Sequence, residues 1–405
     1  MEEVYIIESL RSPIGKFMGG MNELSAVELG AQVVRELSSR IGKEVRIDGL
    51  ISGNVLSAGI GQNPAKQVVM GAGLQSNIPT LNVNMVCASG LRAIEIAANM
   101  IRTGDAEVVI AGGMESMSNS PRIIGGTRQF GRMGDMELVE LCKHSSESGD
   151  RYRLVDEMVL DGLWDCYSEV HMGELAGRIS KRYNISRKEQ DRFALRSHQR
   201  AEAARQNGYF KEEIVGIRRR DGETISEDEG IRSDTSIEKL GALKPAFRSS
   251  TVTAGNSSQL SDGAAFAIVA SKSKVEEMGI RPIGKIEAYA DSGIDPEWYG
   301  LAPIDSVRIV LKKAGVGLES VDLVEINEAF AVQTLAVMKE LDIDESKLNP
   351  NGGAIALGHP LGASGARILT TLLHSMRRMG KYRGIATLCH GGGGSASMIV
   401  SRVDQ

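Results

Sequence analysis

Two spacings of apolar residues recur along the chain. Short, mainly apolar runs at residues 4–7, 107–111 and 262–270 predict buried strands. A stretch with apolar residues every three to four positions, as in residues 91–101, predicts an amphipathic helix. Strand and helix alternate through residues 4–111 and again through 283–388. This alternation predicts an α/β fold with a parallel sheet covered by helices on both faces.

Sequence signals mark where two of the early helices begin. Ser25 and Glu28 have the spacing of a capping box, in which each side chain binds the other residue's backbone N–H. Asn63 precedes Pro64, and a proline is well tolerated in the first turn of a helix. We therefore expect helices that start directly after Ser25 and Asn63.

The alternation stops in residues 118–259, which are rich in charge, methionine and glycine and show no strong strand pattern. We expect an excursion inserted in the first domain and lying over the functional site. Its most polar part, residues 218–234, is expected to be a solvated loop. The predicted division is residues 1–117 with 260–281 as an N-terminal half, 118–259 as a loop domain, and 282–405 as a C-terminal half.

The second half of the chain repeats features of the first. Cys-Ala-Ser-Gly at 87–90 precedes a helix, as does Gly-Ala-Ser-Gly at 362–365, and the glycine-rich turn at 110–114 resembles the one at 389–393. The two pairs are offset by 275 and 279 positions, a difference that a loop absorbs easily. Duplication would make the two helices counterparts whose amino ends face each other. The alternative is chance similarity between glycine-rich turns.

Composition narrows the class of protein. The chain has 405 residues, 42% of them hydrophobic, which is enough for two or three domains with a sizeable core. The formal net charge of −5 comes from well-mixed signs with no basic stripe, which argues against nucleic acid as a partner. No apolar run of about 18 residues is present and no signal region precedes the first strand, so we expect no membrane span and no secretion signal.

The cysteines point to chemistry rather than to structure. Cys87, Cys142, Cys166 and Cys389 contain no C-x-x-C pair, so neither a metal site nor a disulfide framework is expected, and a reducing cytoplasm fits. Cys87 lies where a strand gives way to a largely buried helix. Free N–H groups and the helix dipole there favour a thiolate and lower the pKa of a cysteine. The alternative is a buried cysteine that acts as a small hydrophobic residue.

Three further segments place reactive side chains beside glycine-rich turns and predicted strands: residues 327–330, 351–362 and 389–394. Loops at one edge of a sheet commonly build sites. His359 is a base suited to pH 5–8, and a nucleophilic thiol needs such a base nearby. Cys389 supplies a second thiol for proton exchange with a substrate carbon, and the N–H groups of the glycine turns suit an oxyanion.

Taken together, these motifs resemble those of the thiolase family over essentially the whole chain. The resemblance implies a duplicated fold of two βαβαβαββ halves in five layers, α/β/α/β/α, with an inserted loop domain. The matching segments are R-S-P-I-G-K-F (11–17), N-x-V-C-A-S-G-L-R-A (84–93), A-G-G-M-E-S-M-S (111–118), T-V-T-A-G-N-S-S (251–258), N-E-A-F (327–330), G-G-A-I-A-L-G-H-P-L-G-A-S-G (352–365) and C-x-G-G-G (389–393).

The resemblance implies a role for each reactive residue. Cys87 would take the acyl group from acyl-CoA as a thioester, and His359 would deprotonate Cys87 and help hold the thioester oxygen of the incoming substrate. Asn327 would position a water beside His359 and complete a first oxyanion site. Cys389 would remove the α-proton of the second acetyl-CoA. The N–H groups of Cys87 and Gly391 would form a second oxyanion site over the acyl-enzyme.

Related families fit less well. Ketoacyl synthases resemble this layout but carry a histidine where this chain has Asn327, and they lack the second cysteine. The hydroxymethylglutaryl-CoA synthases use a glutamate base, a pattern that is not seen here. Asn327 together with Cys389 therefore favours a thiolase.

Substrate-binding residues follow from the same resemblance. His171-Met172-Gly173 is similar to the H-M-G element of acetoacetyl-CoA thiolases, in which the methionine narrows the acyl pocket and the histidine lies near pantetheine. The alternative for Met172 is a core-filling methionine. Arg219 or Arg220 is a candidate for the CoA phosphates, although charged loops usually face solvent. Residues that match the wall of the pantetheine channel are Phe247, Ala254, Ser258 and Phe330.

Three features depart from the family pattern. Glu174-Leu175-Ala176 replaces small and polar residues after H-M-G, and residues 138–152 resemble an insertion near the pocket or the assembly surface. His390 stands where a small or apolar residue is expected. We hypothesise that His390 alters the electrostatics near Cys389. The alternative is a ring that is turned away and hydrogen-bonded.

The resemblance implies an acyl-CoA C-acyltransferase that joins two acetyl-CoA molecules to acetoacetyl-CoA and CoA, or runs the reverse cleavage. Acyl-CoA and CoA would be its substrates, with no tightly bound cofactor, and a homodimer or homotetramer is expected. Two alternatives are a broader 3-ketoacyl-CoA thiolase and a non-catalytic thiolase-like carrier or scaffold protein. The sequence leaves open the physiological direction, the range of acyl lengths and the oligomeric state.

Overall fold

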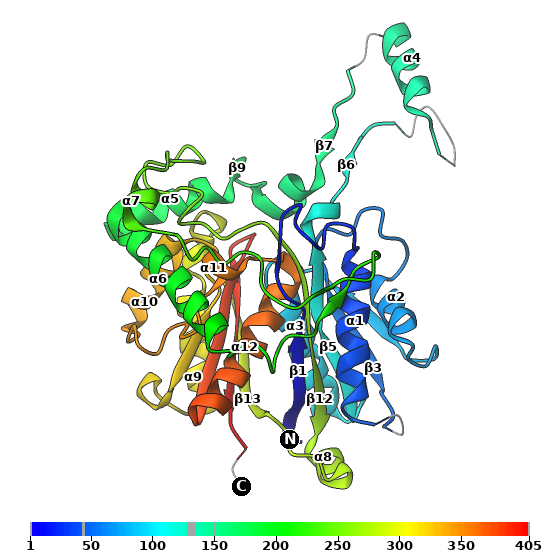
Figure 1. The fold of residues 1–405 in the computed structure, drawn as a ribbon, viewed down its shortest axis with the longest axis vertical. Coiled ribbons are helices and arrows are strands. Elements are labelled where there is room, and N and C mark those ends of the chain that lie inside the picture. The colour runs from blue at the N-terminus through cyan, green and yellow to red at the C-terminus, as the bar shows by residue number, and fades with distance from the viewer. Residues whose placement is uncertain (1, 43–44, 128–134, 149–150, 404–405) are drawn as a thin grey trace.

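A ten-stranded mixed sheet runs through the molecule in a computed structural model that describes residues 2–42, 45–127, 135–148 and 151–403 (Figure 1). Its order is β14-β15-β16-β13-β1-β12-β5-β3-β4, with the short β2 paired to β12. The strands are β1 (Val4–Arg11), β2 (Gly15–Lys16), β3 (Gly49–Gly53), β4 (Thr80–Val83), β5 (Val108–Ser116), β12 (Ser261–Ser271), β13 (Gly284–Gly293), β14 (Leu323–Ile326), β15 (Arg383–His390) and β16 (Gly394–Ser401).

The sheet consists of two halves with the same pairing pattern. In the first half β4, β3 and β5 are parallel, and β12 and β1 follow antiparallel. In the second half β14 and β15 are parallel, and β16 and β13 follow antiparallel. A parallel bridge from Val324 to Leu348 takes the place that β4 has in the first half. The predicted duplication is confirmed.

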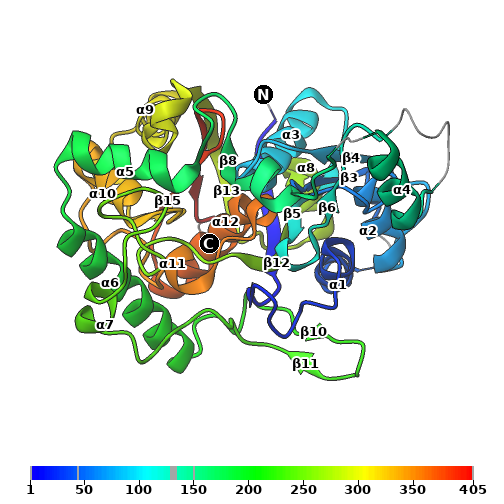
Figure 2. The ribbon, with the colours of Figure 1, turned by 90° about the horizontal axis from the view of Figure 1, so that it is seen from above.

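Helices cover both halves and also separate them, which confirms the five predicted layers (Figures 1 and 2). Helices α1 and α2 pack on one face of the first half, α9 and α10 pack on the outer face of the second, and α3 and α12 fill the space between. The two halves become one sheet where β1 pairs with β13 through Val4, Tyr5 and Ile6. The helices of these layers are α1 (Ala26–Ser39), α2 (Pro64–Ala72), α3 (Ser89–Thr103), α8 (Lys272–Met278), α9 (Pro303–Ala314), α10 (Ala331–Leu341), α11 (Ala354–Leu357) and α12 (Ser364–Met379).

The predicted helix starts are confirmed. The Ser25 N–H donates to Glu28 Oε2 at 2.8 Å, and the Glu28 N–H donates to Ser25 Oγ at 3.2 Å, which completes the capping box of α1. Asn63 caps α2 by accepting the Lys66 N–H, with Pro64 in the first turn. These contacts satisfy N–H groups that a helix cannot pair internally.

Helices α3 and α12 approach each other at their amino ends through glycines. A Cβ atom on Gly90 would lie 2.8 Å from the Gly362 carbonyl oxygen, and one on Gly365 would lie 2.5 Å from the Leu91 nitrogen. A larger residue at either position would push the helices apart. The two helix starts therefore face each other, as the duplication predicts.

Residues 118–259 contain two-residue strands and several helices, the longest of which is α6 with 20 residues, and α4 stands on an arm that projects from the body (Figure 1). The arm includes the predicted insertion, of which residues 149–150 lie outside the described residues. The division into three domains stays a prediction. The elements are β6 (Arg122–Ile123), α4 (Leu138–Ser148), β7 (Val155–Asp156), a π-helix (Met158–Leu163), β8 (Trp164–Asp165), β9 (Val170–His171), α5 (Met172–Tyr183), α6 (Arg187–Gln206), β10 (Ile217–Arg218), β11 (Thr224–Ile225) and α7 (Ile237–Gly241). Among the described residues, none of the helices has the length and apolar character needed to cross a membrane.

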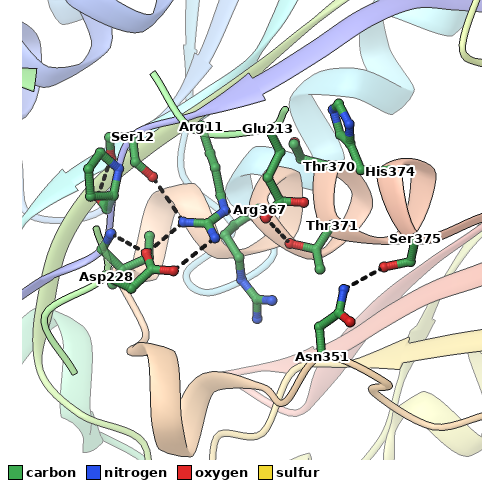
Figure 3. A network of polar contacts seen from close by, with 12 residues as sticks. Arg11, Ser12, Glu213, Asp228, Asn351, Arg367, Thr370, Thr371, His374 and Ser375 are labelled. Atoms are coloured by element: carbon green, nitrogen blue, oxygen red, sulfur yellow. Dashed lines mark hydrogen bonds and ion pairs between the residues drawn. The ribbon is translucent and has the colours of Figure 1, made fainter. Parts of the chain in front are cut away.

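A buried ion-pair network anchors this segment to the sheet (Figure 3). Arg11 of β1 is fully buried, and its guanidinium donates to Glu213 Oε1 at 2.6 Å and to both oxygens of Asp228 at 2.7 and 2.9 Å. The Thr371 hydroxyl of α12 donates to the same Glu213 oxygen at 3.1 Å. The expectation that residues 218–234 form a solvated loop is therefore wrong at Asp228, because the buried Arg11 needs a carboxylate partner.

Replacing Arg11 tests the anchoring role of this network. Arg11→Gln leaves Glu213 and Asp228 buried without their cation, and we expect the free energy of unfolding in denaturant to fall by about 3–5 kcal/mol. Arg40 pairs with Glu8 and Glu36 at the surface. The control Arg40→Gln should change the free energy of unfolding by less than about 1 kcal/mol. Equal, small losses for both variants would contradict an anchoring role for Arg11.

Candidate active site

Cys87 lies in a tight connection between β4 and α3. The preceding residue, Val86, has φ 48°, a left-handed conformation that is unfavourable for a β-branched side chain. Ser89 holds the connection from both sides, because its hydroxyl accepts the Met85 N–H at 2.9 Å and donates to the Val86 carbonyl at 2.6 Å. The strained connection places Cys87, a half-buried residue, in front of the helix start.

The second half brings its own loops to the same place. Asn327 follows β14, and its N–H donates to the Thr387 carbonyl of β15 at 3.1 Å. Cys389 lies near the end of β15, and Gly391 lies in the turn that leads to β16. A Cβ atom on Gly391 would lie 3.5 Å from Val86 Cγ1, so this turn packs directly beside the Cys87 connection. The predicted residues of both halves thus meet at one edge of the sheet.

The thiols of Cys87 and Cys389 are close enough for the charge of one to change the pKa of the other. Burial raises the pKa of Cys389, and the neighbouring Cys87 raises it further. Burial also raises the pKa of Cys87 to about 12, although the N–H groups of Gly391 and of Cys87 itself act in the opposite direction. The expectation that the helix start lowers this pKa is therefore wrong, because desolvation outweighs the two N–H groups.

His359 is a buried, neutral imidazole. Burial and the nearby charge of Arg367 lower the pKa of His359 to about 3. The Ser364 hydroxyl donates its proton to the Pro360 carbonyl at 2.8 Å, so it accepts from His359 Nδ1 at 2.5 Å. Nδ1 therefore carries the ring proton, and the unprotonated Nε2 accepts a long hydrogen bond from Asn327 Nδ2 at 3.4 Å. The arrangement leaves His359 ready to accept a proton.

The His359 loop is held by hydrogen bonds from side chains that are not themselves candidates for the chemistry. Glu328 accepts hydrogen bonds from Ser197 Oγ at 2.6 Å, Asn349 Nδ2 at 2.9 Å and the Ile355 N–H at 3.2 Å. The His359 N–H donates to the Gln259 carbonyl at 3.0 Å. Glu328 belongs to the N-E-A-F segment, so the motif marked its importance, whereas its partners come from distant elements.

A cavity of about 430 Å³ leads to this site. Three of its rings pack together: His171 stacks on Phe247 with centroids 4.3 Å apart, and Phe330 meets Phe247 edge-on at 6.3 Å. Met172 does not line the cavity, but its Cε would lie 3.9 Å from a Cβ atom on Gly391. The predicted residues that line the cavity are His171, Phe247, Ala254, Ser258, Phe330 and His359.

The inner end of the cavity adjoins Cys87. Met117, Leu163 and Leu361 line the cavity and belong to the same apolar cluster that packs against Cys87. Leu163 closes the π-helix at residues 158–163, a helix type that often occurs at functional sites. The cavity thus has an apolar end next to the thiol and a predominantly aromatic wall farther out.

Two sequence expectations do not match the geometry. Arg219 and Arg220 do not line the cavity; Arg219 pairs with Glu23, Asp221 and Glu223, and Arg220 pairs with Glu28. The cations that do line the cavity are Lys16 and Arg232. Nearby carboxylates explain the difference, because Glu28 of α1 pairs with Arg220, whereas Glu23 before α1 and two residues of the same loop pair with Arg219.

His390 also differs from the hypothesis made for it. Its Nδ1 lies 2.7 Å from the Gly391 carbonyl oxygen, and its ring packs against Gly394. Burial lowers the pKa of His390, and His390 does not contribute to the pKa shift of Cys389. Neighbouring residues of a strand point to opposite faces of the sheet, so the His390 ring is turned away from the Cys389 sulfur.

The raised pKa of Cys87 has a direct kinetic consequence. Because only the thiolate reacts, alkylation of Cys87 by iodoacetamide should accelerate about tenfold for each pH unit from about pH 6.5 to 9.5 without a plateau, as followed by peptide mass spectrometry. A short cysteine peptide, used as a control, should level off above its ordinary pKa of about 8.5. A plateau for Cys87 below about pH 8 would show a stabilised thiolate and contradict this expectation.

Comparison with known proteins agrees with this geometry. The sequence model of the thiolase N-terminal domain matches residues 4–273, and that of the thiolase C-terminal domain matches residues 280–402. The chain is 47% identical over 406 residues to an acetyl-CoA acetyltransferase of Chromobacterium violaceum and 44% identical over 408 residues to one of Cupriavidus necator, with 99% of this chain and 100% of each relative covered. A crystal structure of the Bacillus anthracis acetyl-CoA acetyltransferase superposes with a TM-score of 0.91 at 39% identity, covering 100% of this chain and 99% of that one. With both domain models matched and full-length relatives above 40% identity, the chain belongs to the thiolase family.

Proposed function

We propose that this thiolase joins two acetyl-CoA molecules to acetoacetyl-CoA and CoA, and runs the reverse cleavage, through an acetyl group on Cys87. The observation that carries the proposal is the meeting of two thiols from opposite halves, next to a cavity that is lined by the neutral imidazole of His359 and by the apolar cluster that packs against Cys87. The names of the relatives from Chromobacterium violaceum and Cupriavidus necator support acetyl-CoA as the substrate.

In the first step His359 Nε2 accepts the proton of the Cys87 thiol, and the sulfur attacks the thioester carbon of acetyl-CoA. Collapse of the tetrahedral intermediate breaks the bond to the CoA sulfur, which leaves as CoA-SH after taking up a proton. Two neutral groups suit this transfer, because no charge has to be buried before the substrate arrives. The acetyl group then remains on Cys87 as a thioester.

In the second step Cys389, after giving up its own proton to a base, removes the α-proton of another acetyl-CoA as a thiolate. The resulting carbanion attacks the carbonyl carbon of acetyl-Cys87, and the carbon–sulfur bond to Cys87 breaks, which releases acetoacetyl-CoA and leaves a Cys87 thiolate that takes the proton back. The N–H groups of Cys87 and Gly391 hold the oxygen of the acyl-enzyme, each contributing about 3 kcal/mol of transition-state stabilisation. A water positioned by Asn327, together with His359, holds the thioester oxygen of the attacking acetyl-CoA. Asn327 Oδ1 is buried and accepts no hydrogen bond from the described residues, which suits such a water.

The cavity supports a CoA thioester as the ligand. Its aromatic wall of His171, Phe247 and Phe330 suits the pantetheine chain, with Ala254 and Ser258 along the same channel. Met172 lies beside the Gly391 turn and would limit the length of the acyl group. Neither a metal nor a tightly bound cofactor enters the proposed mechanism. We further propose a cytoplasmic homodimer or homotetramer, as the family resemblance implies.

Labelling tests the covalent step and separates an enzyme from a non-catalytic carrier. Incubation with labelled acetyl-CoA should leave one acetyl group on Cys87, detected by peptide mass spectrometry, because the thioester is an obligatory intermediate. Cys87→Ala should lose the label, whereas Cys389→Ala should keep it but lose condensation by at least about 1,000-fold. Cys142 is exposed on α4, and the control Cys142→Ala should behave like the unaltered protein. Binding of acetyl-CoA without any acylation would support a carrier.

Acyl-chain preference separates a narrow thiolase from a broad one. We expect thiolysis of acetoacetyl-CoA to be faster than thiolysis of a longer 3-ketoacyl-CoA. Met172→Ala should improve kcat/KM for the longer substrate relative to acetoacetyl-CoA by about tenfold or more, the usual effect of a few methylene groups of space. A preference of the unaltered protein for the longer substrate would favour the broader 3-ketoacyl-CoA thiolase.

A further inference from the structure

The turn between β15 and β16 contains a residue that faces Cys87, and its backbone is conformationally flexible because it consists of glycines. It contains three consecutive glycines, and Gly392 and Gly393 have φ values of 85° and 82°. One end of the turn is fixed where the Gly393 carbonyl accepts the Ile294 N–H at 2.7 Å. At the other end the Gly391 N–H faces the Cys87 sulfur. This N–H belongs to the peptide group between His390 and Gly391, next to the peptide group that carries the Gly391 carbonyl, so its position relative to Cys87 depends on how the Gly391 backbone is held on both sides.

His390 supplies that restraint. Its Nδ1 lies 2.7 Å from the Gly391 carbonyl oxygen, and because a carbonyl only accepts, the ring donates Nδ1–H to it. The rest of the ring lies across the hairpin on Gly394. A Cβ atom at residue 394 would lie only 2.3 Å from His390 Nε2 and 2.5 Å from Cε1. The ring can take this position only because residue 394 is a glycine.

We propose that His390 is a positioning residue, whose hydrogen bond to Gly391 keeps the Gly391 N–H aimed at the oxygen of acyl-Cys87. This inference rests on the proposed acetyl-enzyme mechanism. An oxyanion donor contributes most when it is already oriented before the charge develops, since its reorganisation then costs nothing during the reaction. A turn of three glycines without a side-chain restraint would have to be ordered in each catalytic cycle.

The competing explanation is that the ring merely fills space on Gly394. Two substitutions separate the hydrogen bond from the shape. His390→Phe keeps a ring of similar size but removes the N–H. His390→Asn removes the ring but keeps an N–H donor, because Asn Nδ2 branches from the same carbon as His Nδ1.

Steady-state kinetics of acetyl-CoA condensation gives the readout. Loss of an entire oxyanion donor lowers kcat by about 100- to 1,000-fold. Loss of the restraint alone leaves the donor in place but no longer held, and should therefore lower kcat by about tenfold. We expect this loss for His390→Phe, with KM within about twofold, and a kcat for His390→Asn within about threefold of the unaltered protein. A KM effect without a kcat effect would indicate a structural role and overturn the proposal.

Gly394→Ala tests the same contact from the opposite strand. The added Cβ should displace the His390 ring and lower kcat about as much as His390→Phe does. In a His390→Ala background the same alanine should cause little further loss, since the contact is already absent. Thermal unfolding of each variant identifies any loss of fold, and labelling of Cys87 by acetyl-CoA verifies that the first step still operates.

The outcomes separate this inference from the proposed function. If the unaltered protein condenses acetyl-CoA and His390→Phe does so at the same rate, the positioning role is wrong while the thiolase mechanism stands. Equal losses in His390→Phe and His390→Asn would also overturn it, because the ring rather than the N–H would then matter. If the unaltered protein forms no acetyl-Cys87, the proposed function fails and the positioning role with it.

Discussion

The close contact between helices α3 and α12 is the constraint on which the site depends. Gly90 and Gly365 leave no room for a Cβ atom, and a Cβ atom on Gly113 of β5 would lie 2.0 Å from the Gly362 carbonyl oxygen. Backbone therefore packs on backbone where the two halves meet. Cys87 precedes one of these helices, and His359 lies just before the other. A methyl group at Gly90 or Gly365 would force the two helix starts, and the loops that precede them, apart.

Burial then sets the protonation states. The same exclusion of water raises the pKa of Cys87 and lowers that of His359, so the resting site holds a neutral thiol and a neutral imidazole. A dry site strengthens every hydrogen bond to a developing charge. The N–H groups of Gly391 and Cys87 face the Cys87 sulfur in this environment, which supports the oxyanion role proposed for them. Burial raises the free energy of the thiolate in the ground state. In the proposed transition state the charge has moved to an oxygen that N–H groups stabilise, so burial favours that state relative to the thiolate.

Charged side chains away from the substrate maintain this arrangement. Arg11 ties Glu213 and Asp228 of the loop segment to the first strand, and Glu328 holds the backbone that leads to His359. Arg11, Glu213 and Asp228 are buried and paired, so removing one would leave a charge without its partner. Glu328 is also buried, but its partners are neutral hydrogen-bond donors. The loops that carry the chemistry are consequently more rigid than their glycine content suggests. His390 extends the same principle to the Gly391 turn.

Sequence alone determined what depends on neighbours along the chain. The capping box of Ser25, the cap at Asn63, the alternation of strands and helices and the repeat around Cys87 and residue 363 are local patterns, and the fold follows them. Tertiary structure alone decided the pKa of Cys87, the burial of Asp228 and the direction of the His390 ring. The helix dipole at Cys87 is a local property, whereas desolvation depends on the opposite half of the molecule. A sequence pattern reflects local geometry, whereas the burial of a residue depends on all the atoms that the fold brings around it from distant positions in the chain.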